Sequence, residues 1–480
     1  MIWKKITKDN IAYELKEYFR NQPFRISNYS TVYQYMWNAS WISSEYAIED
    51  DTLLMRCRYD GRIYFSFPLP LNLENTETKE LAAIKKIEDF CTKNNLELNY
   101  VNIPEERLAM LTNRYQNGVH IYMDRQWQDY LYNIDDFKDF KGRKFSGQRN
   151  HINKFRSKYP NARFKTYTAE DKPRIMEFFK EFEETQFSKE DLVAIEELKK
   201  AREVMNDFDL FDIFCGYYEI DGKIVSVAVG EICNDTIIEH IEKSLREYDG
   251  IYASTVQAFT RTFGKEGILY VNREEDIGDM GLRKSKMQYH PCRMIKKYIL
   301  FIDKPLSKLT KMPVIKSGEL VLRRLKDSSA EDYARLAGDI ERNKYWGYDY
   351  RSDWKGSPED TPDAAFFLSL VRKTWRERTE LALGIYLHDK LIGEVVLHKF
   401  TYTFEAEIGM RLLKEYVGHG YAQKAVKAMS DFAFANLSIE KINAKCYKEN
   451  SSSATSLKAA GMLPAGEDDT YFYFYRTPEI

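Results

Sequence analysis

Apolar residues in the last third of the chain follow the two spacings expected of a mixed α/β domain. Short apolar or alternating runs predict strands at residues 319–324, 381–388, 391–400, 404–412, 441–446 and 470–476. Wider spacing predicts helices at residues 328–343, 359–378 and 451–460. Another helix should begin near residue 421, because apolar residues recur there on one helical face: Ala422, Ala425, Val426, Met429 and Ala433.

The middle of the chain has a similar order of elements. Its pattern predicts helices 251–263 and 281–288 and strands at 213–220, 223–232, 236–243, 267–271 and 296–301. The common order of hairpin, strand, helix, strand, helix and strand indicates a repeated fold. An unrelated α/β domain could show the same order, so the repeat gives moderate support only.

Domain boundaries follow from breaks in these patterns. Residues 303–318 contain two prolines and several lysines with little apolar periodicity, which is typical of a linker. A softer boundary lies near residues 141–156. We therefore expect an α/β (α+β) chain of three domains, each a mixed, mostly antiparallel sheet flanked by helices. The predicted domains are 1–145, 146–304 and 318–480, with a linker at 305–317.

Composition excludes several classes of protein. The chain is 44% hydrophobic and 30% charged, with a net charge of −2, so it is not a generic polyanion binder. Its six cysteines are scattered, with no Cys-x-x-Cys pair, so we expect neither a disulfide framework nor a metal site. No run approaches the roughly 20 apolar residues of a membrane span. We expect a cytoplasmic protein, and the oligomeric state stays open.

A loop with two glycines lies between a predicted strand and a predicted helix. Glycines at 418 and 420 let the backbone approach a ligand closely. The following helix directs its unpaired N–H groups to the same place, where they can bind a pyrophosphate. The predicted cofactor-binding residues are Val417, Gly418, His419, Gly420, Tyr421, Ala422 and, further along, Asn450. Asn450 could equally cap the helix that follows it.

Residues from about 318 to 480 resemble the GNAT acetyltransferase superfamily, especially its ribosomal-protein N-acetyltransferase-like branch. The loop matches the family's Gln/Arg-x-x-Gly-x-Gly/Ala pattern at Gly420 and Ala422, with Val417 in the first position. Asn450 and Ser453 match the later Asn-x-x-Ser pattern. The resemblance implies acetyl-CoA as co-substrate and a primary amine as acceptor, either a small molecule or a peptide N-terminus.

Acetyl transfer to an amine needs a base, because an aliphatic amine arrives protonated. Glu407 is the first candidate and Glu394 the second, although a strand Glu is often merely solvated. Ser453 or Tyr447 could protonate the departing thiolate. The aromatic loop that follows the first predicted helix of this domain could form the acceptor pocket, or simply pack: Trp346, Tyr348, Asp349, Tyr350 and Asp353.

Residues 1–305 resemble the phosphatidylglycerol lysyltransferase C-terminal-like family, which also occurs as free-standing bacterial proteins. Segments 148–155, 240–243, 272–278 and 281–286 carry the resemblance. It implies two GNAT-like lobes in tandem and an acyl- or aminoacyl-transferase-like module. The predicted substrate-binding residues are Glu242, Lys243, Asn272, Arg273, Asp276, Arg283 and Lys286. Asp276 with Arg283 could equally be a plain ion pair. The middle lobe has only Gly250 before its helix, which puts CoA binding there in doubt.

Two stretches of this region are rich in basic residues. Residues 141–165 carry nine Lys and Arg residues and no Asp or Glu, and a second group lies at 283–297. Such runs are usually solvated surface. Otherwise they suggest a phosphate-bearing ligand, such as the end of a tRNA, a CoA nucleotide or a lipid headgroup. A non-catalytic module that binds an acceptor or RNA is the alternative.

Overall fold

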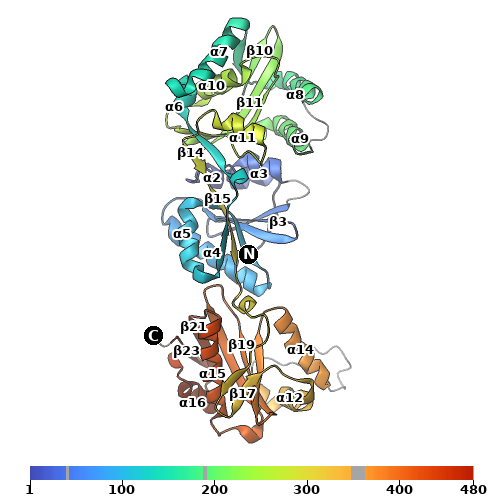
Figure 1. Ribbon diagram of the computed structural model, residues 1–480, viewed down its shortest axis with the longest axis vertical. Helices are drawn as coiled ribbons and strands as arrows, with labels where there is room; N and C mark the ends of the chain where they lie inside the picture. Colours follow the sequence, from blue (N-terminus) through green and yellow to red (C-terminus); the bar gives the residue numbers. More distant parts are fainter. Residues whose placement is uncertain (39–42, 187–191, 347–362, 479–480) are drawn as a thin grey trace. The chain divides into compact units, whose positions relative to one another are not determined.

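The computed structural model describes residues 1–38, 43–186, 192–346 and 363–478. Contacts between Cα atoms divide the chain into two compact units. The first comprises Met1–Lys86, Asn99–Leu111 and Ile121–Phe301, and the second comprises Ile87–Leu98, Thr112–His120 and Ile302–Ile480. Three mixed sheets flanked by helices make up the structure (Figure 1), as the sequence predicts.

The first sheet has the order β1-β2-β3-β4-β6-β15-β7, with β5 paired to β3. Its strands are β1 (Lys4–Lys5), β2 (Ser43–Glu49), β3 (Thr52–Tyr59), β4 (Arg62–Ser66), β5 (Leu69–Pro70), β6 (Leu98–Pro104), β7 (Val119–Tyr122) and β15 (Lys297–Ile302). The helices of this part of the chain are α1 (Lys8–Asn10), α2 (Lys16–Arg20), α3 (Thr31–Trp37), α4 (Thr76–Lys93) and α5 (Glu105–Tyr115).

The second sheet has the order β14-β8-β13-β12-β11-β10-β9. Its strands are β8 (Asp129–Asn133), β9 (Arg163–Thr166), β10 (Ile213–Ile220), β11 (Lys223–Cys233), β12 (Thr236–Ser244), β13 (Tyr270–Asn272) and β14 (Arg293–Ile295). Its helices are α6 (Ile134–Asp139), α7 (Ser146–Lys158), α8 (Lys172–Gln186), α9 (Leu192–Asn206), α10 (Ile251–Phe263) and α11 (Met280–Met287). One apolar core lies under α8 and α9, and another lies under α6 and α10.

Two strands lie in a different sheet from the one that their position in the sequence suggests. The predicted strand 296–301 should complete the middle lobe, but it is β15 and lies inside the first sheet between β6 and β7. Conversely, β8 precedes the predicted boundary at residue 145 yet lies in the second sheet. Apolar periodicity identifies a strand but not its partner, so the sequence pattern does not reveal this exchange.

The third sheet has the order β16-β17-β18-β19-β20-β21-β23-β22. Its strands are β16 (Ile315–Ser317), β17 (Leu320–Arg323), β18 (Leu381–Leu387), β19 (Lys390–His398), β20 (Glu405–Leu412), β21 (Lys441–Tyr447), β22 (Leu463–Glu467) and β23 (Tyr471–Arg476). The helices are α12 (Ala330–Gly338), α13 (Ile340–Asn343), α14 (Ala364–Arg376), α15 (Tyr421–Asn436) and α16 (Ser451–Ala459). The short strands β16 and β22 are not predicted by the sequence pattern, and β16 lies within the predicted linker.

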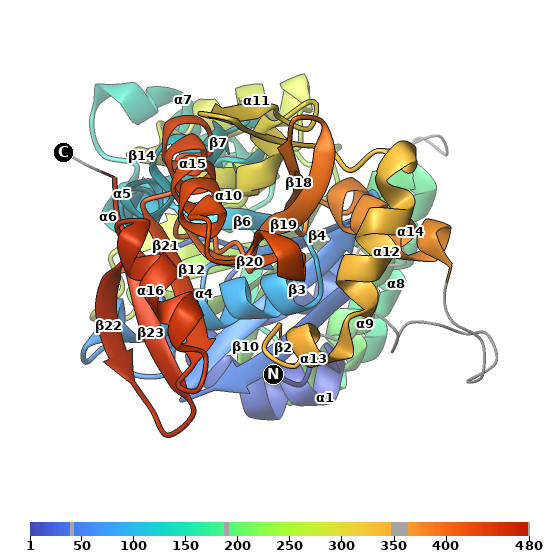
Figure 2. The ribbon, with the colours of Figure 1, turned by 90° about the horizontal axis from the view of Figure 1, so that it is seen from below.

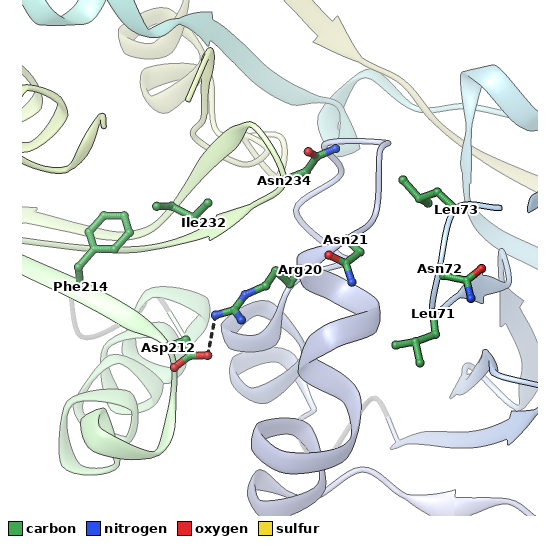
Figure 3. Close-up of a pocket in the computed structure, with 9 residues that line it drawn as sticks. All are labelled: Arg20, Asn21, Leu71, Asn72, Leu73, Asp212, Phe214, Ile232 and Asn234. Carbon is green, nitrogen blue, oxygen red and sulfur yellow. Dashed lines mark hydrogen bonds and ion pairs between the residues drawn. The ribbon is translucent and has the colours of Figure 1, made fainter. Parts of the chain in front are cut away.

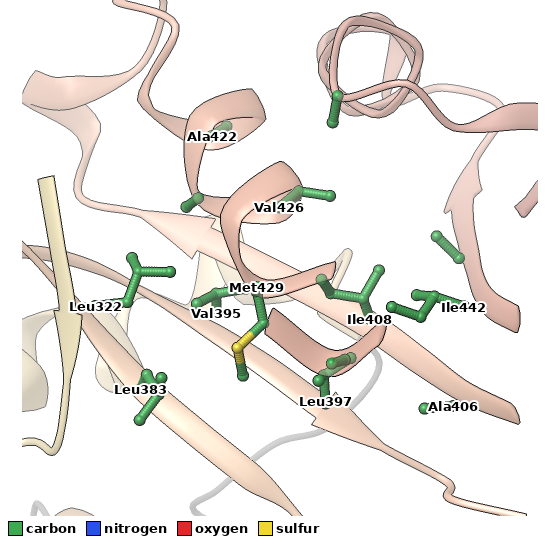
Figure 4. Close-up of a cluster of buried hydrophobic side chains, with 14 of the residues drawn as sticks. Leu322, Leu383, Val395, Leu397, Ala406, Ile408, Ala422, Val426, Met429 and Ile442 are labelled. Carbon is green, nitrogen blue, oxygen red and sulfur yellow. The ribbon is translucent and has the colours of Figure 1, made fainter. Parts of the chain in front are cut away.

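Helices cover both faces of the third sheet. α15 and α16 lie on one face and α12 and α14 on the other (Figure 2). Ala422, Val426 and Met429 of α15 point into the core between this helix and the sheet (Figure 4). The predicted apolar face of this helix is therefore confirmed. Burial of these side chains fixes the helix, and hence the loop before it, against the strands.

Among the described residues, no helix combines the length and apolar character that a membrane crossing requires.

Candidate functional site

The third sheet opens between two parallel strands. β20 and β21 pair only at Glu405–Glu407 with Lys441–Asn443, whereas β21 pairs with β23 along Ile442–Tyr447. A cavity of about 1380 Å³ lies here, lined by residues of β19, β20, β21, α14, α15 and α16. Where two strands part, their backbone groups and side chains become available to a ligand. The C-terminal domain therefore has a cavity at the position where an α/β sheet commonly binds a ligand.

The predicted glycine loop forms one wall of this cavity. Gly418 and Gly420 have φ of 90° and 78°, in the left-handed region that favours glycine. Gly420 is the N-cap residue of α15, and no side chain caps that helix. Its first backbone N–H groups are therefore open to an anionic ligand. Val417, Tyr421 and Ala422 also line the cavity.

His419 differs from the rest of the loop. Its ring stacks on Tyr421 at a centroid distance of 5.8 Å and an interplanar angle of 14°. Its Nδ1 lies 3.1 Å from the Val417 carbonyl oxygen. These contacts hold the imidazole along the loop rather than in the cavity.

Asn450 and Ser453 lie at the opposite wall. The Asn450 Oδ1 accepts a hydrogen bond from the Ser453 N–H at 3.2 Å and so caps α16. Both residues also line the cavity. Capping and lining are therefore compatible, since the capped helix directs its N-terminal end at the cavity.

Glu407, the first predicted base, lines the cavity on β20. Its Oε2 lies 2.9 Å from the Lys399 Nζ, and its Oε1 lies 3.7 Å from the His398 Nε2. His398 also lines the cavity, and burial lowers the pKa of its imidazole. No sequence motif marks His398; only the pairing of β19 with β20 places it opposite Glu407.

Glu394, the second predicted base, has no free oxygen for this task. Its side chain is fully buried and accepts hydrogen bonds from Arg411 Nε at 3.0 Å, Arg411 Nη2 at 2.8 Å and the Tyr333 hydroxyl at 2.8 Å. Its oxygens are occupied by Arg411 and Tyr333, and it is not among the residues that line the cavity. The structure therefore speaks against Glu394 as the base.

Aromatic residues close another part of the cavity. Tyr447 packs between Tyr345 and Tyr471, with ring centroids 5.5 and 4.6 Å away, and its hydrogen bond with Tyr471 raises its pKa. The Trp346 ring lies 4.7 Å from the Arg411 guanidinium and also lines the cavity. The other residues of the predicted acceptor pocket lie outside the described part of the chain: Tyr348, Asp349, Tyr350 and Asp353.

Glu380 is a second cavity residue that sequence reasoning missed. It lies immediately before β18, is half-buried and lines the cavity. Burial, followed by the charge of Glu394, raises the pKa of its carboxyl. A carboxyl with a raised pKa inside a cavity is a candidate for binding a cation or a proton.

Most of the residues predicted for the N-terminal module come together in a buried cluster at the end of β13. Arg273 pairs with Glu239 at 2.7 Å and with Glu242. The Lys286 ammonium donates to the carbonyl oxygens of Arg273 and Glu275 at 2.6 Å each. The charges of Arg273 and the two glutamates largely compensate one another, but Oε1 of Glu239 and Oε1 of Glu242 are buried without a hydrogen-bond partner among the described residues.

Asp276 joins this cluster on its more exposed side. It pairs with Arg283 at 2.8 Å, accepts from the Tyr130 hydroxyl at 2.6 Å and lies 3.3 Å from Arg125. Burial opposes its ionisation, but the hydrogen bonds from Arg283 and Tyr130 prevail and lower its pKa to about 2. The Arg283 side chain is 27% exposed, so its guanidinium remains accessible to a ligand.

Asn272 is buried and donates to Asp129 at 2.9 Å and to the Arg25 carbonyl oxygen at 2.7 Å. Lys243 does not belong to the cluster. It pairs with Glu197 of α9 at 2.7 Å, because residues 242 and 243 of β12 point to opposite faces of the sheet. Grouping Lys243 with the other six residues is therefore wrong.

His240 is buried between two carboxylates that the sequence did not single out. Its Nε2 lies 2.8 Å from Glu231 and its Nδ1 lies 2.7 Å from Glu274. Burial alone would lower the pKa of His240, but the two carboxylates outweigh it and raise it to about 9. Glu231 also accepts from the backbone N–H groups of Thr31 and Val32, at 3.2 and 2.9 Å.

The basic run at 141–165 is much less positive in the folded chain than in the sequence. Five of its lysines pair with acids from elsewhere along the chain: Lys141 with Asp139, Lys144 with Asp136, Lys154 and Lys158 with Asp249, and Lys165 with Glu219. In the second stretch, Arg293 and Lys296 pair with Glu105, and the Lys297 ammonium is buried between Asp129 and Glu275. These pairs reduce the positive surface that a polyanion would meet.

A smaller cavity of about 700 Å³ lies in the first unit, among residues of α2, β10, β11 and the segment after β5. Asn21, Leu73 and Asn234 are among its lining residues (Figure 3). Its one cation, Arg20, already pairs with Asp212 at 2.8 Å. The lining therefore offers a ligand no charge that is not already compensated.

Comparison with known proteins assigns both parts of the chain. Residues 19–301, more than half of the chain, match the family model for phosphatidylglycerol lysyltransferase, C-terminal. Residues 319–463 match the model for the acetyltransferase (GNAT) domain. Two Bacillus subtilis (strain 168) proteins resemble the chain. The uncharacterized N-acetyltransferase YoaA is 24% identical over 169 residues, which are 35% of this chain and 92% of YoaA. The uncharacterized N-acetyltransferase YnaD is 29% identical over 142 residues, which are 26% of this chain and 83% of YnaD.

A solved structure shares the fold of the larger part. It is a conserved protein of unknown function from Bacteroides thetaiotaomicron VPI-5482, with a TM-score of 0.58 and 24% identity, covering 63% of this chain and 100% of that chain. The family matches together make acyl transfer the activity class of the molecule. The chain belongs to the phosphatidylglycerol lysyltransferase C-terminal family and continues into an acetyltransferase domain of the GNAT type.

Proposed function

We propose that the C-terminal domain transfers the acetyl group of acetyl-CoA to a primary amine. One observation carries the proposal: a single cavity is lined both by the uncapped N-terminus of α15 and by ionisable side chains such as Glu407 and His398. The first feature suits the pyrophosphate of a CoA thioester. The second suits removal of a proton from an ammonium group.

Open space beside the glycine loop supports binding of a CoA nucleotide there. A Cβ added at Gly418 would meet nothing within 4 Å, and one at Gly420 would come no closer than 3.7 Å to Gln423. The backbone at both positions is therefore bare toward the cavity. In this assignment the amides of residues 420–422 bind the pyrophosphate, and acetyl-CoA supplies the activated acyl group. Ser453 and Tyr447, at the α16 side, are the groups that can return a proton to the leaving thiolate.

Two measurements on the full chain test this proposal. Acetyl-CoA should raise the unfolding temperature of the C-terminal domain, and a panel of primary amines should provoke release of free CoA thiol. Gly420→Ala places a Cβ in the loop and should weaken acetyl-CoA binding about tenfold. The matched control is Gly318→Ala, which has the same positive-φ strain at φ 59° outside the cavity. Absence of any acetyl-CoA effect on the wild-type chain would refute the assignment.

For the N-terminal module, a second candidate function is aminoacyl transfer from a charged tRNA, which the family match over residues 19–301 favours. The cations that remain partly exposed beside Asp276 are Arg283 and Arg125. Retention of charged tRNA should fall with rising salt, and should fall further in Arg283→Gln and Arg125→Gln. Arg62→Gln, on β4, is the control. Equal retention by all four proteins would count against this placement of the site.

A further inference from the structure

Three ionisable side chains form a row across the end of the third sheet, inside the cavity. His398, the last residue of β19, is the Cα partner of Glu407 on β20. The pairing of β18 with β19 ends at Leu381 and Leu397, and Glu380 and His398 are the next residues along these two strands. All three residues line the cavity. The strand register therefore brings together two acids and an imidazole that are far apart in the sequence.

His398 is the member of this row best suited to accept a proton. Its side chain is 27% exposed, and burial lowers its pKa, so the imidazole is neutral at pH 7 and has a free lone pair. Glu407 is less available to a ligand, since its carboxylate already forms an ion pair with the Lys399 ammonium at 2.9 Å. At 3.7 Å, Glu407 is instead close enough to orient the ring and to stabilise the imidazolium once it forms.

Glu380 is the second acid of this row. In the described part of the chain no ion pair is found at its carboxylate, and burial raises its pKa. A positively charged ligand beside it would restore the preference for the ionised form. The acceptor supplies such a charge, because an aliphatic amine with a pKa near 10 enters as an ammonium ion.

Building on the acetyl transfer proposed above, we propose that His398 is the catalytic base, that Glu407 positions it, and that Glu380 binds the ammonium group of the acceptor beside it. The acceptor class is therefore an aliphatic amine that binds in its protonated form. A neutral aromatic amine or an alcohol would leave Glu380 without its partner.

Protons and electrons are conserved in this step. His398 takes one proton from R–NH3⁺, which leaves R–NH2 with a free electron pair. That pair forms the C–N bond to the thioester carbonyl, and the C–S bond breaks as the CoA sulfur leaves with its electrons. The second proton of the amine passes to the sulfur, through Ser453, Tyr447 or solvent, and His398 releases its proton to solvent. The net products are an amide, a thiol and one proton.

The charged groups around His398 determine how the rate depends on pH. Glu407 favours its protonated form, whereas Lys399 and Lys445 oppose it, and Glu380 lies at its other side. The net pKa is below the usual value. With His398 as base, kcat/KM should be flat from about pH 7 up to the pKa of the amine. It should fall only below about pH 6.5, the usual pKa of histidine.

The experiment measures kcat/KM against pH 6–10 in the full chain with 1,4-diaminobutane and with a tripeptide that has a free N-terminus as probes. His398→Asn should lower the rate at pH 7 by about 10²–10⁴-fold. The remaining activity should rise about tenfold per pH unit, since only the free amine then reacts. His388→Asn is the control, because His388 is exposed in the β18–β19 turn.

Two further variants separate the roles. Glu380→Gln should raise KM for the amine about tenfold and leave kcat and the acetyl-CoA effect nearly unchanged. Glu407→Gln should move the acid limb to lower pH, because it removes the charge that favours imidazolium. If His398→Asn keeps the flat profile with less than a threefold loss, the inference fails while the acetyl transfer stands. If the wild-type chain turns over neither probe, the acetyl transfer itself fails and the inference with it.

Discussion

The second and third sheets share a strand topology, but different residues occupy the place where their parallel strands separate. In each, an antiparallel hairpin is followed by a parallel strand pair, β12 with β13 and β20 with β21, that soon separates. In each, the helix after the third strand begins at a glycine with positive φ: 84° at Gly250 and 78° at Gly420.

What covers that glycine differs between the two domains. A Cβ at Gly250 would lie 2.1 Å from the carbonyl oxygen of His151, because α7 packs against the start of α10. At Gly420 the space is open and belongs to the cavity. The parting strands of the second sheet are also filled, by the ion pairs of Arg273 and the contacts of Lys286. The shared topology therefore does not determine whether the helix N-terminus can bind an anion. The segment that packs against the glycine determines it.

The largest expected difference in stability is between alanine substitutions at the two glycines. Gly250→Ala forces a Cβ into the α7 backbone and adds positive-φ strain, so it should destabilise the first unit by about 3 kcal/mol or more. Gly420→Ala introduces only the positive-φ strain and should lower the free energy of unfolding by about 1 kcal/mol. Calorimetry of both variants measures the difference. Equal losses would mean that α7 does not close the second sheet as described.

The buried His240 and the partly exposed His398 give the next contrast. His240→Asn leaves Glu231 and Glu274 without their cation and should destabilise the first unit by about 3 kcal/mol. His398→Asn removes one contact at 3.7 Å and should cost less than about 1 kcal/mol in the second unit. Denaturant titration of the two variants tests the pair, and a similar cost at both positions would contradict the contrast.

Acetyl-CoA should stabilise one unit only. At a free concentration of about 100 times its Kd, binding should contribute about 2.7 kcal/mol to the C-terminal domain. The transition of the N-terminal unit should stay in place, because the start of α10 is covered. A shift of both transitions would show that the second sheet also binds the thioester.

Raising or lowering the pH should affect the two units in opposite directions. The pKa of His240 is raised to about 9, so its contribution to stability is complete below its unfolded value of about 6.5 and is lost as the pH rises through 9. The pKa of His398 is lowered, so the C-terminal domain loses stability as the pH falls through about 6.5. Calorimetry from pH 5 to 10 follows both transitions. His240→Asn should flatten the alkaline loss of the first unit.

Glu380→Gln should have the smallest effect and the opposite sign. Its raised carboxyl pKa means that at neutral pH ionisation favours the unfolded chain, so the amide should raise the melting temperature of the C-terminal domain, on the order of 1–3 °C. Thermal unfolding at pH 7 measures it. A lower melting temperature would indicate that Glu380 already has a stabilising partner.

Local sequence signals predicted the parts of the site that depend on neighbouring residues. The loop at Gly418–Gly420, the apolar face of α15 and the cap at Asn450 each depend on residues that are close together in the sequence, and the structure has the positive-φ glycines, the buried face and the cap. His398 and Glu380 could not be found this way. The register of β19 with β20 places His398 opposite Glu407, and the register of β18 with β19 brings Glu380 to the same end of the sheet; a single sequence does not give these registers.

The same limit applies elsewhere. In the run at 141–165, part of the charge compensation comes from a residue distant in sequence, Asp249, which pairs with Lys154 and Lys158. Lys243 was taken together with Glu242 from the segment 240–243 that carries the family resemblance, although neighbours in a strand point to opposite faces. Glu394 has the residue type of a catalytic base, but its carboxylate is buried in an ion pair with Arg411.

The strand exchange between the first two sheets has a consequence for biosynthesis. β15 lies between β6 and β7, so the first sheet has a gap in its interior until residue 302 has been made. A nascent chain ending near residue 145 would expose the edges of β6 and β7, which are prone to pair wrongly. Release of a folded N-terminal lobe from the ribosome should therefore wait for the second lobe, and truncation between them should give aggregates rather than a smaller domain.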